Sequence, residues 1–149
     1  MAIMDYNAQA ASERVATMDF TFLARRLETI GETAETSAEA VSLYRQFLQL
    51  HAENPQQPLV PPQAADRAWH EHILYTRRYD ADMKALFGHS VHHVPDVEDA
   101  STYEAAVAFT REAFKGRFGV DMKAGDFAMC IRASDFAMCI LTADERVAA

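Results

Sequence analysis

Five of the six histidines of this chain lie between positions 70 and 93. They stand in a Trp-His-x-His string that follows an aspartate, and in a second group about twenty positions later. The residues concerned are Asp66, Trp69, His70, His72, His89, His92 and His93. Imidazole and carboxylate groups bind divalent transition metals, and histidine also exchanges protons near neutral pH. This segment therefore predicts either a metal site or a polar Asp–His hydrogen-bond network.

Spacing along a helix decides which of these side chains can reach one ion. Asp66 and His70 are four residues apart, so they share a helix face. His72 lies about 200° round the helix from His70. One helix cannot aim both imidazoles at a small ion without strain, and a loop that folds back has to supply a further ligand.

Asp66 and His70 with a histidine of the following loop give a set of two histidines and one carboxylate. That set suits Zn²⁺ or Fe²⁺ and leaves positions open for water. The candidate metal ligands are Asp66, His70, His72 and His93, with His92 as the alternative to His93. Glu71 is weaker because it projects from another face. The rival interpretation is an Asp66–His70 hydrogen bond that satisfies a buried imidazole.

The remaining sequence carries no other motif that names a reaction. It has no glycine-rich phosphate loop and no Gly-x-Ser-x-Gly element. Its two cysteines, Cys130 and Cys139, are not spaced as Cys-x-x-Cys, which favours two inert thiols. Whether the protein is an enzyme is therefore left open.

Composition limits the classes of partner. The chain has 149 residues, of which 50% are hydrophobic and 24% charged, as is typical of one globular domain. Its net charge of −8 disfavours nucleic acid as a partner. No apolar run approaches the roughly 18 residues of a membrane span, so we expect no membrane partner. Because the sequence begins without a secretory signal and has few cysteines, we expect a cytoplasmic protein.

Helical periodicity runs through most of the chain, and it predicts an all-α, single-domain bundle of about four main helices. We divide the chain into a loose lead-in or short helix over 1–16, a helical domain over 17–120, and a tail of uncertain structure over 121–149. The third helix is expected to be the longest and central. It should run from Pro62 to about Phe87.

Further signals mark the ends of the predicted helices. Thr36 and Ser101 each precede a glutamate by three residues, as in capping boxes that begin a helix. Gly88 should close the third helix. We expect a loop from His89 to Asp99.

The tail contains a tandem copy of six residues, Asp126-Phe-Ala-Met-Cys-Ile131 and Asp135-Phe-Ala-Met-Cys-Ile140. A period of nine puts the copies on opposite faces of a helix or a strand. A hairpin through Arg132-Ala-Ser134 and a local duplication in a loose tail both fit this pattern. The Phe/Met-rich tail is our candidate contact for a homo-oligomer or a protein partner.

Several separated motifs occur in order between residues 43 and 95. They are Leu59-Val-Pro-Pro62, Asp66-x-x-Trp69-His70-x-His72, Tyr79, Leu86-Phe-Gly88 and His92-His93-x-Pro95. The string resembles the glycine-rich-domain-containing-protein-like family, whose function is largely unknown. The resemblance implies that the Asp, Trp and His residues of these motifs form one spatial unit. RNA binding, which plant members suggest, is not carried over, because this chain has only five glycines and no basic aromatic region.

Two hypotheses follow from the sequence. The leading one is a small cytoplasmic helical domain whose polar Asp/His site binds a divalent transition metal. The alternative is a non-catalytic protein-interaction or scaffold module in which the Asp/Trp/His cluster is structural.

Overall fold

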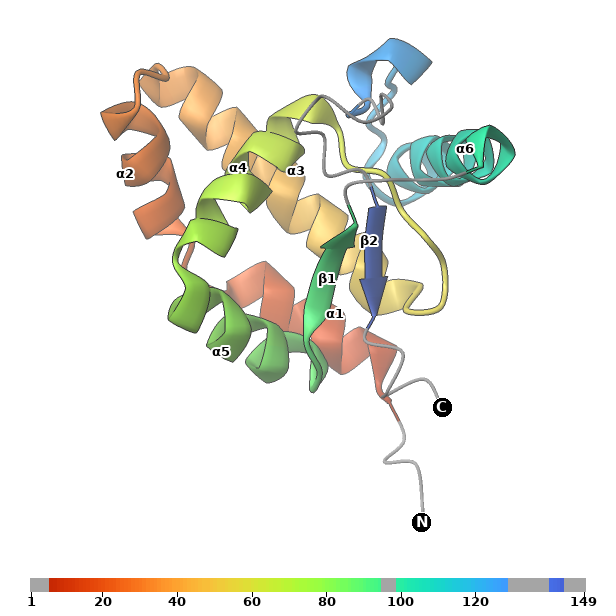
Figure 1. Ribbon diagram of the computed structural model, residues 1–149, viewed down its shortest axis with the longest axis horizontal. Coiled ribbons are helices and arrows are strands. Elements are labelled where there is room, and N and C mark those ends of the chain that lie inside the picture. Colours follow the sequence, from red (N-terminus) through yellow and green to blue (C-terminus); the bar gives the residue numbers. More distant parts are fainter. Residues whose placement is uncertain (1–5, 95–98, 129–139, 144–149) are drawn as a thin grey trace.

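The computed structural model describes residues 6–94, 99–128 and 140–143. Within these ranges the chain forms six α-helices, one short 3₁₀ helix and one two-stranded sheet (Figure 1). The helices are α1 (Ala8–Thr17), α2 (Thr21–Thr29), α3 (Ala34–Glu53), α4 (Gln63–Leu74), α5 (Thr76–Phe87) and α6 (Ala100–Phe118); η1 (Ala124–Asp126), β1 (Val91–Val94) and β2 (Ile140–Ala143) complete the set. The mostly helical class is confirmed, but about four main helices is too few.

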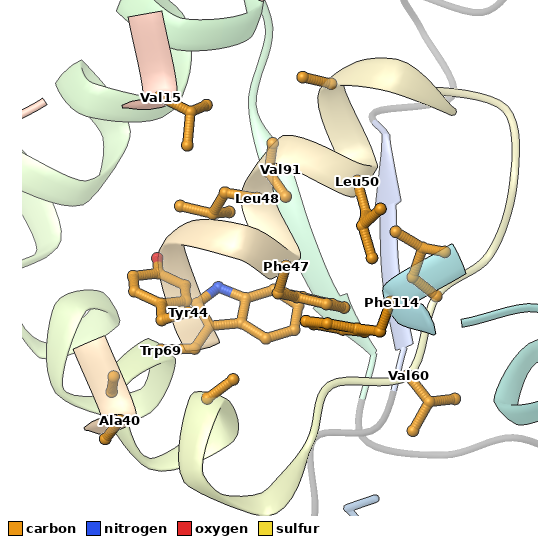
Figure 2. Packing of buried hydrophobic residues seen from close by; sticks show 14 of the residues in the cluster. Val15, Ala40, Tyr44, Phe47, Leu48, Leu50, Val60, Trp69, Val91 and Phe114 are labelled. Atoms are coloured by element: carbon orange, nitrogen blue, oxygen red, sulfur yellow. The ribbon is translucent and has the colours of Figure 1, made fainter. Parts of the chain in front are cut away.

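The core is built around α3, which contacts α1, α2, α4 and α6. This helix is the longest, with 20 residues, so the third predicted helix is not the longest or the central one. Tyr44, Phe47 and Leu48 of α3 are fully buried, as is Trp69 of α4 (Figure 2). Phe47 and Trp69 pack with their ring centroids 5.4 Å apart. Burial of such large apolar side chains is the main stabilising term of the fold.

The predicted helix from Pro62 to Phe87 is two helices, α4 and α5, because the backbone leaves the helical region at Tyr75 (φ −83°, ψ 67°). The break turns α5 so that Asp82 reaches the ring of His72 at 2.8 Å. It also brings the Tyr79 hydroxyl to the indole of Trp69 at 3.0 Å. No glycine or proline marks the break, so the local sequence gives no warning of it.

The helix ends differ slightly from the predicted caps. Thr33, not Thr36, caps α3, and its hydroxyl accepts a hydrogen bond from the Thr36 backbone N–H at 3.1 Å. Asp99 caps α6 by accepting from the backbone N–H of Ser101 at 3.0 Å. Gly88 closes α5 in the left-handed conformation, as predicted.

The segment predicted as a loop after His89 contains strand β1. It pairs antiparallel with β2, with Val91 opposite Ala143 and His93 opposite Leu141 (Figure 1). The sequence missed β1 because four residues carry too little periodicity, and their partner lies far along the chain. The tail therefore returns to the histidine segment.

Part of the first tail copy belongs to the core. Phe127 is fully buried and forms an isolated bridge with Pro62, and the Ala128 backbone N–H donates to Pro61 at 2.9 Å. The proposed hairpin turn over Arg132–Ser134 lies outside the described residues, as do Cys130 and Cys139.

Of the two alternatives for residues 1–16, the described part shows a short helix, α1. Its residues Ala11 and Val15 are fully buried against the core. Arg14 donates two hydrogen bonds to the carbonyl of Leu86 at the end of α5. No helix in the described ranges is long and apolar enough to span a membrane.

Candidate metal centre

Helix α4 places Asp66 and His70 on one face, as their spacing predicts. Asp66 lies in the first turn, where its backbone N–H donates to Pro62 at 2.9 Å. The Nε2 atom of His70 is 3.2 Å from Asp66 Oδ2. The carboxylate is buried, whereas the side chain of His70 is 32% exposed. Solvent therefore reaches the pair mainly on the His70 side.

Strand β1 supplies a third side chain, His93. Its Nε2 atom is hydrogen-bonded to Asp66 Oδ1 at 3.2 Å, and its side chain is 2% exposed. Alternate residues of a strand point to opposite faces, so His93 shares its face with the buried Val91 while the side chain of His92 is exposed. The structure thus brings His93, not its alternative His92, to Asp66 and His70.

Trp69 supports the His93 ring. The indole and the imidazole stack with centroids 3.6 Å apart and planes inclined by 20°. Since Trp69 is fully buried against Phe47 (Figure 2), it offers a fixed surface on which the imidazole lies. The plane of the His93 ring is therefore set by the core.

Three candidate ligand atoms converge in this cluster. One nitrogen each from His70 and His93 and one oxygen of Asp66 all lie within 4.8 Å of one another. Ligands at typical metal distances are separated by roughly 3 to 4 Å, so small side-chain rotations suffice to close the set around one ion. In the described residues no other group of three or more His, Cys, Asp or Glu side chains meets this condition.

Two buried nitrogens of the cluster have no hydrogen-bond partner among the described residues. They are Nε2 of His70 and Nδ1 of His93. The first is close to Asp66 Oδ2, at 3.2 Å, but lacks the alignment of a hydrogen bond. Buried polar atoms without partners are rare, and an imidazole nitrogen in that position can bind a metal ion. The donor set therefore fits a metal ion.

The charges of the cluster favour an ionised carboxylate. Burial raises the pKa of Asp66, but its contacts with His70 and His93 outweigh burial and leave that pKa below its ordinary value. The contact with Asp66 raises the pKa of His70. Burial lowers the pKa of His93 despite its hydrogen bond to Asp66. Asp66 is thus in the state that binds metal, whereas His93 donates from Nε2 to this carboxylate, so both His93 and His70 have to free the ligating nitrogen of its proton when a metal binds.

His72 lies in a separate cluster. Its Nδ1 is 2.7 Å from the hydroxyl of Tyr44 and its Nε2 is 2.8 Å from Asp82 Oδ2. A carboxylate only accepts, so Nε2 donates to Asp82 and Nδ1 accepts from Tyr44. Burial lowers the pKa of His72, in keeping with a neutral ring. Both nitrogens are occupied, and the structure does not bring His72 to Asp66.

Glu71 also points elsewhere, because its carboxylate pairs with Arg26 at 2.9 Å. Tyr44 and Asp82, which are 28 and 10 residues from His72, were not among the predicted site residues. No local pattern signals contacts of this kind. Tyr79 stood in the motif string, but without a role.

Residues 14–115, well over half of the chain, match the sequence model of the UCP032817-like family. The chain belongs to the UCP032817-like family. This finding corrects the resemblance to the glycine-rich-domain-containing-protein-like family, which rested on short motifs over about a third of the chain. The UCP032817-like region includes Asp66, His70 and His93, whereas β2 lies beyond it. No curated protein and no solved structure matches the chain significantly.

Proposed function

We propose that this protein binds one divalent transition metal ion through Asp66, His70 and His93. The observation that carries the proposal is the convergence of their three ligand atoms within 4.8 Å from two separate elements. Two imidazoles and one carboxylate suit Zn²⁺ or Fe²⁺, whereas Ca²⁺ and Mg²⁺ prefer oxygen ligands. His72 is not part of this set.

The surroundings of the cluster support a bound ion with open positions. Three protein ligands leave room for water or a small ligand, and the exposed edge of His70 gives access to the ion. A divalent ion there would act as a Lewis acid and lower the pKa of a bound water. Asp66 would offset part of the ion's charge, and Trp69 would hold the ring of His93 in place.

The test is elemental analysis of protein purified without a histidine tag. We expect near-stoichiometric Zn or Fe in the wild type, and loss of that metal in His70→Gln with an unchanged circular dichroism spectrum. His92→Gln is the matched control, because it removes an exposed histidine next to His93. Wild-type protein that stays metal-free after incubation with Zn²⁺ or Fe²⁺ would overturn the proposal.

The alternative is a structural Asp–His–Trp network in a non-catalytic module. It is favoured by the hydrogen bond of His93 to Asp66 at 3.2 Å and by the stacked Trp69, because both contacts join α4 to β1 directly. In that case added metal has no effect. Each of the variants His70→Gln and Asp66→Asn then lowers the free energy of unfolding by the same amount with and without metal. If added Zn²⁺ stabilises the wild type but neither variant, this alternative is wrong.

The alternative also assigns a contact with a protein partner or a second copy to the Phe/Met-rich tail. Phe127 is fully buried, so such a contact would use other tail residues. Mass in solution, measured by light scattering over a hundredfold range of protein concentration, tests self-association. A constant monomer mass would end the homo-oligomer version of this proposal.

A further inference from the structure

The hydroxyl of Tyr79 joins three elements around the candidate metal centre. It accepts a hydrogen bond from the indole N–H of Trp69 on α4 at 3.0 Å. It donates a hydrogen bond to the backbone carbonyl of Val91 on β1 at 2.8 Å. Tyr79 itself belongs to α5. One oxygen atom therefore ties the indole of α4 to the backbone of β1.

These two bonds end next to the candidate ligands. Trp69 immediately precedes His70 and stacks on the ring of His93 at 3.6 Å. Val91 lies two residues before His93 on the same face of β1. A displacement of the Val91 carbonyl would carry His93 with it, because neighbouring residues of a strand move together.

We propose that Tyr79 is the positioning residue of the Asp66–His70–His93 metal centre, holding β1 against α4 so that His93 meets Asp66. This inference rests on the proposed function, because it concerns the geometry of the same site. The hydroxyl acts through Trp69 and Val91 and touches no ligand itself. Groups that orient metal ligands typically change metal affinity by about 10- to 100-fold when removed.

The chemistry of the phenol suits this role. A Tyr hydroxyl both accepts and donates, and here both capacities are used by partners on different elements. Burial raises the pKa of Tyr79, so its proton stays available to the Val91 carbonyl at any physiological pH. Phenylalanine keeps the ring but supplies neither bond.

The experiment compares Tyr79→Phe with Tyr44→Phe. The control also removes one buried tyrosine hydroxyl, but that hydroxyl bonds to His72 and not to the metal cluster. Zn²⁺ dissociation constants are measured by competition with a chromophoric chelator, and stability is measured by urea unfolding. We expect Tyr79→Phe to weaken Zn²⁺ binding about 10- to 100-fold. Tyr44→Phe should leave the dissociation constant unchanged, although both variants lose stability.

A metal-free readout separates this inference from the proposed function. The stacked indole shifts the proton resonances of the His93 ring upfield, and these shifts are measured by NMR on the apoprotein. In Tyr79→Phe they should move toward their free values, whereas in Tyr44→Phe they should stay. If the wild type binds no Zn²⁺ but the His93 resonances still move in Tyr79→Phe, the proposed function is wrong and the positioning role of Tyr79 stands. Unchanged His93 resonances and an unchanged dissociation constant in Tyr79→Phe would overturn the positioning role.

Discussion

Single side chains in this protein differ sharply in how well their polar atoms are satisfied. His72 has a partner at each ring nitrogen. His51 of α3 is 1% exposed, and neither of its nitrogens has a partner among the described residues. Its nearest ring is that of Phe87, with centroids 4.8 Å apart. His51 is thus buried without the hydrogen bonds that satisfy His72.

The acid sensitivity of the fold should depend on His51. Burial lowers the pKa of this imidazole from 6.5 to about 3, so the unfolded state binds more protons between these values. The free energy of unfolding should therefore fall as pH drops from about 6.5 toward 3, at up to about 1.4 kcal/mol per pH unit from this residue. Urea unfolding of wild type and His51→Leu at pH 7.5, 5.5 and 4.5 measures the effect.

The difference between the two proteins reports chiefly on His51, because groups distant from it titrate equally in both; His89, whose ring lies 6.0 Å away, also contributes to the lowered pKa of His51. As pH falls, we expect the free energy of unfolding of His51→Leu to increase steadily relative to that of the wild type. Parallel stability curves for the two proteins between pH 7.5 and 4.5 would contradict the assignment.

At the scale of elements, the break at Tyr75 is the feature that shapes the polar clusters. A continuous helix would carry Tyr79 and Asp82 away from α4. The broken helix returns them to Trp69 and His72, where their polar atoms make partly buried hydrogen bonds. These bonds replace contacts with water that an exposed helix would keep, and they favour this one arrangement of α4 and α5.

Asp82 should hold the α4–α5 pair together. Asp82→Ala leaves a buried nitrogen of His72 without its acceptor, which costs about 1 to 3 kcal/mol of unfolding free energy. Asp80→Ala is the control, since Asp80 pairs with Lys84 on the exposed surface and such pairs contribute little. Chemical denaturation of both variants checks this. Equal losses would show that the His72–Asp82 contact contributes no more than a surface ion pair.

Glycine-to-alanine substitutions should have opposite signs at two helix positions. Gly88 ends α5 at φ 78°, where a side chain is strained by about 1 kcal/mol. Gly116 lies inside α6, where alanine stabilises by about 0.5 to 1 kcal/mol. A Cβ atom at either position meets nothing within 4 Å, so backbone conformation alone sets the sign. Thermal unfolding should give a lower midpoint for Gly88→Ala and a higher one for Gly116→Ala, and a shared direction would refute the argument.

At the scale of the whole molecule, the C-terminal tail completes the helical bundle. Phe127 packs in the core beside Pro62, and β2 pairs with β1. The candidate metal centre, on α4 and β1, thus lies next to a strand from outside the family region. The predicted division into lead-in, domain and tail remains a prediction. The hydrophobic core, however, includes buried residues of all three segments, such as Val15 and Phe127.

Phe127→Ala should therefore destabilise the whole protein. Truncating a fully buried phenylalanine costs about 3 to 5 kcal/mol, so we expect a cooperative loss of stability in urea. Phe118→Ala, at the partly exposed end of α6, should cost less. An unfolding midpoint unchanged by Phe127→Ala would mean that the tail is not part of the cooperative unit.

The sequence by itself determined the features that depend on near neighbours. These include the mostly helical class, the shared face of Asp66 and His70, the separation of His72 from that face, and the end of α5 at Gly88. Each follows from backbone geometry over a few residues. The tertiary structure alone decided that the helix breaks at Tyr75, that His93 rather than His92 meets Asp66, and that Tyr79 joins Trp69 to β1. Those outcomes depend on contacts between distant segments, whose burial and hydrogen bonds outweigh local preference.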